Sequence, residues 1–256
     1  MKYNRLQALR EYILKNHKVE ITDVAEKMQV SVETVRRDFG VLEEEGFLKK
    51  VYGGAELADD NVMPMLMDAW GKRMKTAKKE KEAIAEKALE WIPDNSVIAL
   101  DSGTTLYCLA RRLKAKSNLT VVSNSLYNVM EISNNSDNLV YCIGGAIKKN
   151  ESISTGFIAS NFLGFFSRFD LALISSDGIT PDEGLTDFSM DMCLVKREFL
   201  KKCEKIIMLV DHTKFGINAG YKTCDFSDVD VLITDKAAPE EMLKKFRDGG
   251  SEIVLV

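Results

Sequence analysis

Seven short, almost uninterrupted apolar runs in the second part of the chain constrain its fold more than any other feature. They are Val97–Leu100, Leu119–Val122, Leu139–Ile143, Leu171–Ile174, Ile206–Val210, Val229–Ile233 and Ile253–Val256. Such runs are typical of strands that are buried on both faces. Helix-like stretches separate most of them, around residues 105–114, 125–134, 157–167, 189–202 and 238–247. Strands that alternate with helices predict an α/β domain with a mainly parallel sheet.

The first part of the chain has a different pattern, with apolar residues at helical spacing. Leu6, Leu9 and Ile13 predict one helix, and Val24 to Met28 predict a second. Ser31 is a good N-cap for a third helix. This third helix would bury one apolar face, made of Val32, Val35, Phe39 and Leu42. Gly46 stands where a C-cap glycine ends a helix, and residues 47–54 then read as a hairpin. Three helices followed by a hairpin predict a winged helix-turn-helix domain.

A weakly patterned segment lies between the two parts. It contains Asp59-Asp60-Asn61 and Pro64, and a charged amphipathic helix follows it from Thr76 to Trp91. We therefore expect a winged helix-turn-helix domain at residues 1–57, a linker at 58–75 and an α/β domain at 76–256. The length of 256 residues is compatible with two domains.

The third helix of the first domain carries the candidate DNA-binding residues. In this plan the last helix enters the major groove, with its early residues facing base edges. Arginine suits that role because its guanidinium group pairs bidentately with guanine or phosphate. Lys49 and Lys50 flank the hairpin and could contact the DNA backbone. The outward positions on the helix are Ser31, Glu33, Thr34, Arg36 and Arg37. On spacing alone, a plain packing unit with two solvated arginines remains an alternative.

The overall charge argues against a general nucleic-acid or membrane binder. The chain carries 35 Lys and Arg against 39 Asp and Glu, a net charge of −4. Residues 72–81 are an exception, with six Lys or Arg against Glu80 alone, and we expect them to contact DNA or a partner subunit. Non-specific DNA affinity should therefore be modest, and selectivity should depend on an oligomer that engages several half-sites.

Three further classes of site or location are disfavoured. The longest aliphatic run, residues 206–210, is too short to span a bilayer, and no apolar leader follows Met1, so we expect a cytoplasmic protein. The five cysteines include no C-x-x-C pair, and His17 and His212 are the only histidines. We therefore expect neither a metal site nor a cofactor.

Polar residues follow several of the predicted strands. Asp101 comes directly after one strand, and Ser102, Gly103, Thr104 and Thr105 precede a helix. Hydroxyls, a glycine and the N–H groups of a helix start suit a phosphate, although a simple helix cap is the alternative. Because the carboxyl ends of parallel strands converge on one edge, the other strand ends should join this site.

The other candidates at strand ends have separate expected roles. Lys214 could neutralise a phosphate, whereas Asp101, Asn124 and Glu183 could hold sugar hydroxyls. His212 either makes a hydrogen bond near its strand end or contacts the effector. The remaining members of the set are Gly144, Gly145, Asp177 and Gly178.

The first domain resembles the DNA-binding domain of the DeoR family of bacterial transcriptional regulators. Residues 30–39 read VSVETVRRDF, and Leu42-Glu43, Gly46 and Tyr52-Gly53-Gly54-Ala55 follow. The family pattern is V-S-x-x-T-I-R-R-D-L, then L-E, G and H-G-G-A. Tyr52 replaces the usual His, Gly40 lies inside the third helix, and Gln29 stands where Gly is frequent.

The second domain resembles the sensor domain of the same family, which is Rossmann-like and similar in fold to ribose-5-phosphate isomerase. The shared motifs are Asp101 to Thr105, Ser123-Asn124-Ser125, Gly144-Gly145 and the DHTKFG segment that includes Lys214. The resemblance implies an effector pocket for a phosphorylated sugar or polyol. It implies a repressor of a carbohydrate-utilisation operon, with self-association into a dimer or tetramer. The alternative is a sugar-phosphate isomerase-like enzyme with an accessory helical domain, but an isomerase has no use for the arginine-bearing helix.

Overall fold

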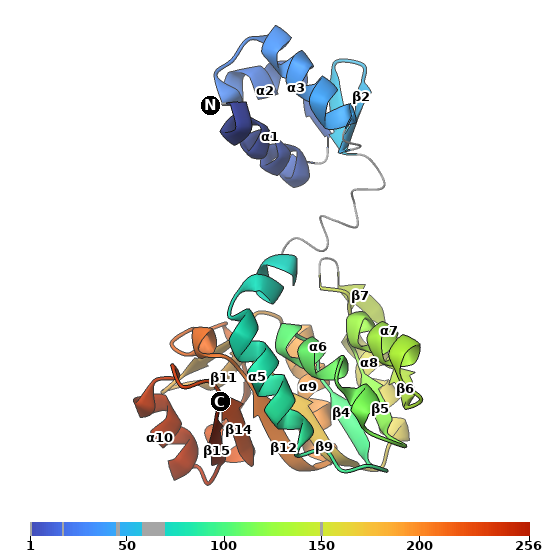
Figure 1. Ribbon diagram of the computed structural model, residues 1–256, viewed down its shortest axis with the longest axis vertical. Helices are drawn as coiled ribbons and strands as arrows, with labels where there is room; N and C mark the ends of the chain where they lie inside the picture. Colours follow the sequence, from blue (N-terminus) through green and yellow to red (C-terminus); the bar gives the residue numbers. More distant parts are fainter. Residues whose placement is uncertain (1, 17, 45–46, 58–69, 149–150) are drawn as a thin grey trace. The chain divides into compact units, whose positions relative to one another are not determined.

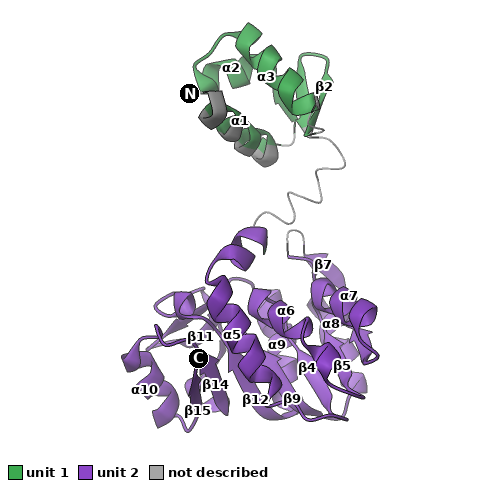
Figure 2. Cartoon of the chain, in the orientation of Figure 1, with its two compact units in different colours: residues 1–70 green, residues 71–256 purple. Residues whose placement is uncertain are grey.

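Residues 2–16, 18–44, 47–57, 70–148 and 151–256 are described by the structure, which is a computed structural model (Figure 1). The chain divides into two units, Met1–Trp70 and Gly71–Val256 (Figure 2). Of the expected linker, residues 58–69 lie outside the described residues, and residues 70–75 are helical. Gly46, the expected C-cap, also lies outside them.

The first unit contains three helices and a small antiparallel sheet. Its elements are α1 (Lys2–Asn16), β1 (Lys18–Glu20), α2 (Ile21–Met28), α3 (Val32–Glu44), β2 (Leu48–Val51) and β3 (Gly54–Leu57). The sheet order is β1-β3-β2, so a short strand that the sequence pattern does not indicate completes the predicted hairpin. Gly54 allows this pairing, because a Cβ atom there would lie 2.0 Å from the carbonyl oxygen of Val19. The expected winged helix-turn-helix is confirmed.

The core of the first unit follows the predicted helical faces. Leu9 and Ile13 of α1 pack with Val35, Phe39 and Leu42 of α3, and all five side chains are buried. Burial of this one face leaves the opposite face of α3 toward solvent.

The second unit is built on a seven-stranded parallel sheet of order β15-β14-β12-β9-β4-β5-β6. Each predicted apolar run forms one strand, with ends shifted by a few residues. The strands are β4 (Val97–Leu100), β5 (Thr120–Ser123), β6 (Leu139–Cys142), β9 (Phe169–Ile174), β12 (Cys203–Leu209), β14 (Val231–Thr234) and β15 (Glu252–Leu255). The expected Rossmann-like α/β class is confirmed.

Helices cover both faces of this sheet (Figure 1). Ile84 and Leu109 belong to the core on one face, whereas Phe199 and Phe246 belong to the core on the other. The helices are α5 (Lys78–Leu89), α6 (Thr104–Ala110), α7 (Leu126–Asn135), α8 (Gly156–Phe162), α9 (Met190–Lys202) and α10 (Glu240–Asp248). Within the described ranges, none of the helices has the length and apolar character needed to cross a membrane.

Short secondary structure fills the connections. The hairpin β7 (Ala146–Lys148) and β8 (Ile153–Thr155) follows β6. An antiparallel sheet of β10 (Gly178–Thr180), β11 (Gly184–Asp187) and β13 (Tyr221–Cys224) lies beyond β9 and β12. Single 3-10 turns are η2 (Leu113–Ala115), η3 (Leu163–Phe165), η4 (His212–Lys214) and η5 (Phe226–Asp228).

Candidate functional site

The start of α3 presents the predicted outward residues. Ser31 caps the helix, because its Oγ accepts a hydrogen bond from the Thr34 N–H at 3.2 Å and lies 2.9 Å from Thr34 Oγ1. Glu33, Arg36 and Arg37 are exposed, and Thr34 is half-buried. Arg36 lies 3.6 Å from Glu33, but both side chains are about two-thirds exposed, and such pairs contribute little. Arg36 can therefore exchange this partner for another anion.

A buried carboxylate supports α3 from behind. Asp38 is 2% exposed and accepts hydrogen bonds from Arg5 Nε at 2.7 Å and Arg5 Nη2 at 3.0 Å. This bidentate pair joins α1 to α3. The sequence analysis quoted Asp38 only as part of the motif that contains Arg36 and Arg37, and it gave Asp38 no role of its own. The helical spacing contains the signal, since Asp38 follows Val35 by three residues and so shares its inward face.

The hairpin is attached to the same helix. Lys50 Nζ lies 2.8 Å from Glu43 Oε2, and its backbone N–H donates to Glu43 Oε1 at 3.0 Å. Lys49 is exposed beside it, and Tyr52 is fully exposed in the turn between β2 and β3. A hollow of about 260 Å³ between α3 and the hairpin is bordered by Arg36 and Lys50. Two of the predicted basic residues, one from α3 and one from the hairpin, therefore border the same hollow.

The second candidate site lies at the carboxyl edge of the large sheet. The chain runs from β4 to β5 and β6 on one side, and then continues with β9 and β12 on the other. The strand order thus reverses between β4 and β9, and ligands of open α/β sheets bind at such a switch point. Asp101 follows β4 and Ser175 follows β9, and the Ser175 N–H points to Asp101 Oδ2 at 3.5 Å.

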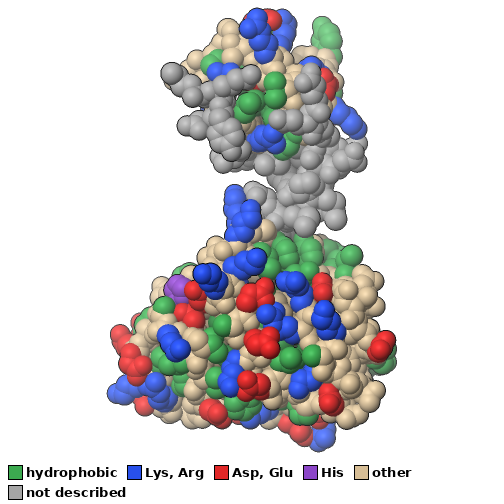
Figure 3. Space-filling model, viewed as in Figure 1, with side chains coloured by type: hydrophobic (Ala, Val, Ile, Leu, Met, Phe, Trp, Pro, Cys, Tyr) green, Lys and Arg blue, Asp and Glu red, His purple; other side chains and the backbone are tan. Residues whose placement is uncertain are grey.

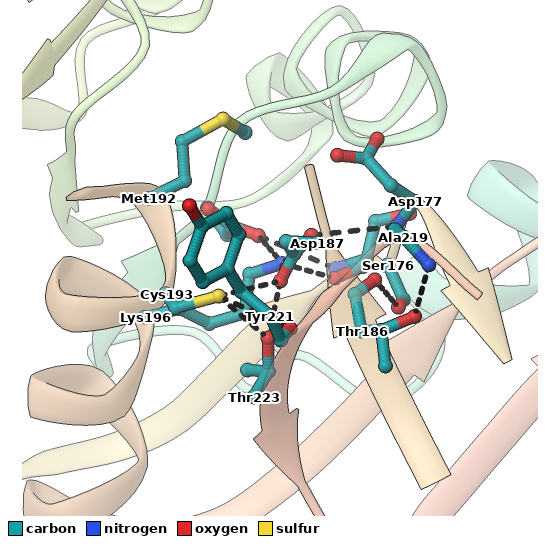
Figure 4. A network of polar contacts seen from close by, with 12 residues as sticks. Ser176, Asp177, Thr186, Asp187, Met192, Cys193, Lys196, Ala219, Tyr221 and Thr223 are labelled. Carbon is teal, nitrogen blue, oxygen red and sulfur yellow. Dashed lines mark hydrogen bonds and ion pairs between the residues drawn. The ribbon is translucent and has the colours of Figure 1, made fainter. Parts of the chain in front are cut away.

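A buried ion cluster underlies this edge (Figure 4). Lys196 Nζ of α9 lies 2.8 Å from Asp187 Oδ2, 3.2 Å from Asp101 Oδ2 and 2.6 Å from the Ser175 carbonyl oxygen. Burial opposes the charge of Lys196, but Asp101 and Asp187 outweigh it and raise the pKa of Lys196. Burial also raises the pKa of Asp101. The Asp101 carboxylate is therefore already engaged by Lys196, a residue that the sequence analysis did not single out.

Several polar groups beside the cluster have no partner among the described residues. Asn124 is 1% exposed, and both its Nδ2 and its Oδ1 are unpaired. The same holds for Asn128 Oδ1 and Ser154 Oγ. Backbone contacts bring them together, since the Asn124 carbonyl accepts from the Ser154 N–H at 2.8 Å and Asn128 Nδ2 donates to the Asp101 carbonyl at 2.9 Å. Buried groups without partners are rare in proteins, and they are typical of a place that a ligand completes.

The glycines and hydroxyls of the predicted pocket border the same edge. Gly103 has φ +126° and precedes α6, whose first residues, Thr104 and Thr105, are buried, as is Ser102. Gly145 has φ +141°, and a Cβ atom there would lie 2.9 Å from Ser154 Oγ. Gly144 precedes it, and a Cβ atom there would meet no described atom within 4 Å.

The positions of Gly178 and Asp177 have structural explanations that need no ligand, and Glu183 lies away from the other candidates. A Cβ atom at Gly178 would lie 2.2 Å from the Ile217 carbonyl oxygen, so glycine is needed there for close packing. Asp177 accepts from the Phe188 N–H at 3.1 Å and stays near the ion cluster. Glu183 is exposed in the turn between β10 and β11, at the opposite end of β11 from Asp187. At about 3.3 Å per residue, four residues place the two backbone positions roughly 13 Å apart. The structure therefore does not bring Glu183 to the other candidates.

Cations gather around the end of β12. Lys214 is half-buried in η4, and Asp211 is fully buried. Lys81 of α5 is also buried, and its Nζ lies 3.7 Å from Asp211 Oδ2. Burial lowers the pKa of Lys81, and Asp211 opposes part of that shift. The expectation that the basic stretch 72–81 contacts DNA or a partner subunit is wrong for Lys81, because the fold turns its side chain inward.

Lys81 also holds the segment that follows the first unit. Its Nζ donates to the carbonyl oxygens of Arg73 at 2.5 Å and Thr76 at 2.7 Å. The Arg73 guanidinium in turn pairs bidentately with Glu151, which precedes β8, at 3.1 and 2.5 Å. We name residues 71–77 the tether, because both contacts attach them to the carboxyl edge of the sheet.

Of the two interpretations of His212, the structure shows the hydrogen bond near the strand end. Its Nδ1 lies 3.0 Å from Asp235 Oδ1, and its backbone N–H donates to Asp235 Oδ2 at 2.7 Å. No group of three or more His, Cys, Asp or Glu side chains that could hold a metal ion occurs within the part of the chain that the structure describes.

Comparisons with known proteins cover almost the whole chain. A model of the DeoR-like helix-turn-helix domain matches residues 5–61, and a model of the DeoR C terminal sensor domain matches residues 76–236. The chain is 32% identical to the HTH-type transcriptional regulator GolR of Listeria innocua, over 97% of this chain and 96% of that protein. It is 30% identical to the glycerol-3-phosphate regulon repressor of Escherichia coli, over 95% of each.

Solved structures give a more distant likeness. Ribose 5 phosphate isomerase A from Neisseria gonorrhoeae matches 54% of this chain and 53% of its own, with 18% identity and a TM-score of 0.41. This likeness concerns the fold alone.

Proposed function

This chain belongs to the DeoR family of transcriptional regulators, and from that premise we propose that its second unit binds a phosphorylated sugar or polyol, which releases the first unit from operator DNA. The chain is a DNA-binding regulator, because the helix-turn-helix match and full-length relatives named as regulators and repressors agree. The same names favour a regulator over the isomerase-like enzyme. We place the protein in the cytoplasm, where bacterial operators lie, and give it no cofactor.

The observation that supports the effector pocket is the unpartnered amide of Asn124 at the switch point of the sheet. An amide both donates and accepts hydrogen bonds, and so does a sugar hydroxyl. One polyol could therefore satisfy Asn124, Asn128 and Ser154 together. Thr104 and Thr105 at the start of α6 would face the phosphate, and Lys214 would balance its charge.

The surface that we propose for DNA is the exposed face of α3 with the hairpin. Arg36 and Arg37 would read bases or phosphates, and Ser31, Glu33 and Thr34 would lie along the same groove wall. Lys49 and Lys50 would contact the backbone from the hairpin. A helix of this kind binds half-sites in pairs, so the chain would act as a dimer or tetramer.

We propose that the tether couples effector binding in the second unit to DNA binding by the first. It directly follows the first unit in sequence, and Lys81 and Glu151 attach it to both sides of the proposed pocket. An anion at this edge would compete with Asp211 for Lys81 and with Glu151 for Arg73. Loss of these contacts would shift the tether. Because allosteric coupling is reciprocal, operator DNA would weaken effector binding by the same factor.

A thermal-shift screen tests the pocket. The probes are phosphorylated sugars and polyols, their unphosphorylated counterparts, and inorganic phosphate. A ligand at 100 times its Kd stabilises the native state by about 2.7 kcal/mol, which raises the melting temperature by roughly 5–10 °C. The Arg36→Ala variant is the matched control, because its sensor is intact and should show the same shift. Equal shifts with unphosphorylated sugars, or none with any probe, would contradict the proposal.

A further inference from the structure

An uncharged stretch forms a rigid, exposed apolar surface on the second unit. Residues 152–167 contain no charged side chain, although 29% of the whole chain is charged. Elsewhere, on the face shown in Figure 3, side chains of both signs are interspersed over the unit. We name the apolar face after five exposed side chains in and beside this stretch: Leu139, Tyr141, Phe157, Ile158 and Phe165.

The side chains of the apolar face form one continuous surface. Phe157 and Ile158 are exposed on α8, where Ile158 precedes Phe162 by four residues and so lies beside it, and Phe165 follows in η3. Ring contacts then lead from Phe165 to Phe162 at 6.1 Å and from Phe162 to Phe166 at 6.1 Å. The Phe166 ring lies 5.6 Å from the ring of Tyr141 in β6. The surface thus extends from α8 to the edge of the large sheet.

The apolar face is held in place from beneath. Lys202 Nζ of α9 donates to the carbonyl oxygens of Leu163 at 2.9 Å and Phe166 at 2.8 Å. These contacts position the turn that carries Phe165, whose side chain is 87% exposed. Aromatic residues on a preorganised backbone lose little conformational entropy on binding, which is a property of interface anchors.

The adjoining edge strand of the large sheet, β6, lacks the features that usually protect such a strand from pairing with another chain. Strand β6 pairs with β5 on one side and is the last strand of the sheet. Its sequence, Leu139 to Cys142, contains no charge and no proline, the usual means by which proteins protect an edge strand.

We propose that the apolar face is the contact between two copies of this chain. A neutral surface can meet its own copy about a twofold axis without bringing like charges together. Phe157 and Phe165 together expose roughly 340 Å², taking about 200 Å² for a fully exposed aromatic side chain. With the other three side chains the area is roughly 600 Å², most of the 800 Å² or so that each partner contributes to a standard interface. The proposal rests on the proposed function in one respect, since paired half-sites require a second copy.

Sedimentation velocity of the full chain over a concentration series tests this contact. We expect at least twice the 28.7 kDa chain mass for the wild type. Phe157→Glu or Phe165→Glu should raise the dissociation constant about 100-fold or more, since each charge enters a twofold interface twice. Leu255→Glu is the matched control, because Leu255 is a partly exposed apolar residue on the opposite edge strand, and it should leave the assembly intact.

The possible outcomes separate the contact from the proposed function. A wild-type chain that is monomeric with and without DNA overturns the proposal, and so does an oligomer that both Phe variants leave unchanged. Circular dichroism spectra of the variants should match the wild type, whereas their melting temperatures should fall because association stabilises the native state; Ile158→Lys replaces any variant that fails to fold. Selection of binding sites from a random DNA pool tests the regulator separately. A monomer that selects one half-site would refute only the contact, whereas a dimer that selects no DNA would refute only the function.

Discussion

Replacement of Asn124 by leucine should stabilise the ligand-free chain while removing its response to effector. The Asn124 amide is 1% exposed and has no partner for either of its polar atoms among the described residues. A buried unsatisfied group costs about 1–3 kcal/mol, and an apolar side chain of similar size removes that cost. For a unit of this size, each kcal/mol corresponds to roughly 2–4 °C in melting temperature.

Asn138 provides the matched control, because its amide is buried but satisfied. Its Nδ2 donates to the carbonyl oxygens of Leu113 at 2.9 Å and Lys116 at 3.2 Å, and its Oδ1 accepts from the Leu119 N–H at 3.0 Å. Asn138→Leu removes these three hydrogen bonds, although the Leu113 carbonyl keeps the Lys116 N–H at 3.0 Å, and it should destabilise the chain by about 1–3 kcal/mol. Any cost of fitting the leucine side chain applies to both variants, so the comparison isolates hydrogen bonding.

The assay is thermal unfolding of both variants and the wild type, each with and without a phosphorylated sugar that binds the wild type. We expect melting temperatures that move in opposite directions and a ligand-induced shift that only Asn138→Leu retains. Equal destabilisation by both substitutions would refute the reasoning, since Asn124 would then have to be satisfied within the protein itself.

Three further predictions concern other parts of the chain. Arg36→Ala or Arg37→Ala should remove about 1–3 kcal/mol of operator affinity in a binding titration if either residue reads a base, and unchanged affinity in both would exclude α3 as the reader. Lys214→Ala or Thr104→Ala should keep operator affinity but abolish release by effector, and a wild-type response in both would place the pocket elsewhere. Gln29 has φ +52° at the end of α2, so Gln29→Gly should relieve about 1 kcal/mol of backbone strain, and a lower melting temperature would contradict this.

Hydrophobic pattern predicted the large sheet because strands buried on both faces leave a strong local signal. The same signal is missing from β1, β7 and β10, which are three residues each and too short to show a period. In addition, β1 pairs with a strand far along the chain, β3, whereas β7 and β10 pair with the next strands, β8 and β11.

The candidate pocket was predictable at strand ends and less so elsewhere. Asp101, Asn124 and Gly145 follow strands whose parallel order brings them together. Lys81 and Lys196 lie within helices, where a lysine normally faces water, and the carboxylates and main-chain carbonyls that the fold brings to them account for their burial. Glu183 was grouped with Asp101 and Asn124, but it lies in the turn before β11, at the opposite end of that strand from Asp187 and the ion cluster.

The contacts of Lys81 with the tether have a consequence for engineering and for divergence within the family. Lys81 holds the main-chain carbonyls of Arg73 and Thr76, and every amino acid supplies such a carbonyl. Substitutions at these two positions therefore leave that attachment in place. A junction just before Gly71 should let one sensor be spliced to many different DNA readers, each inheriting the same mechanical connection.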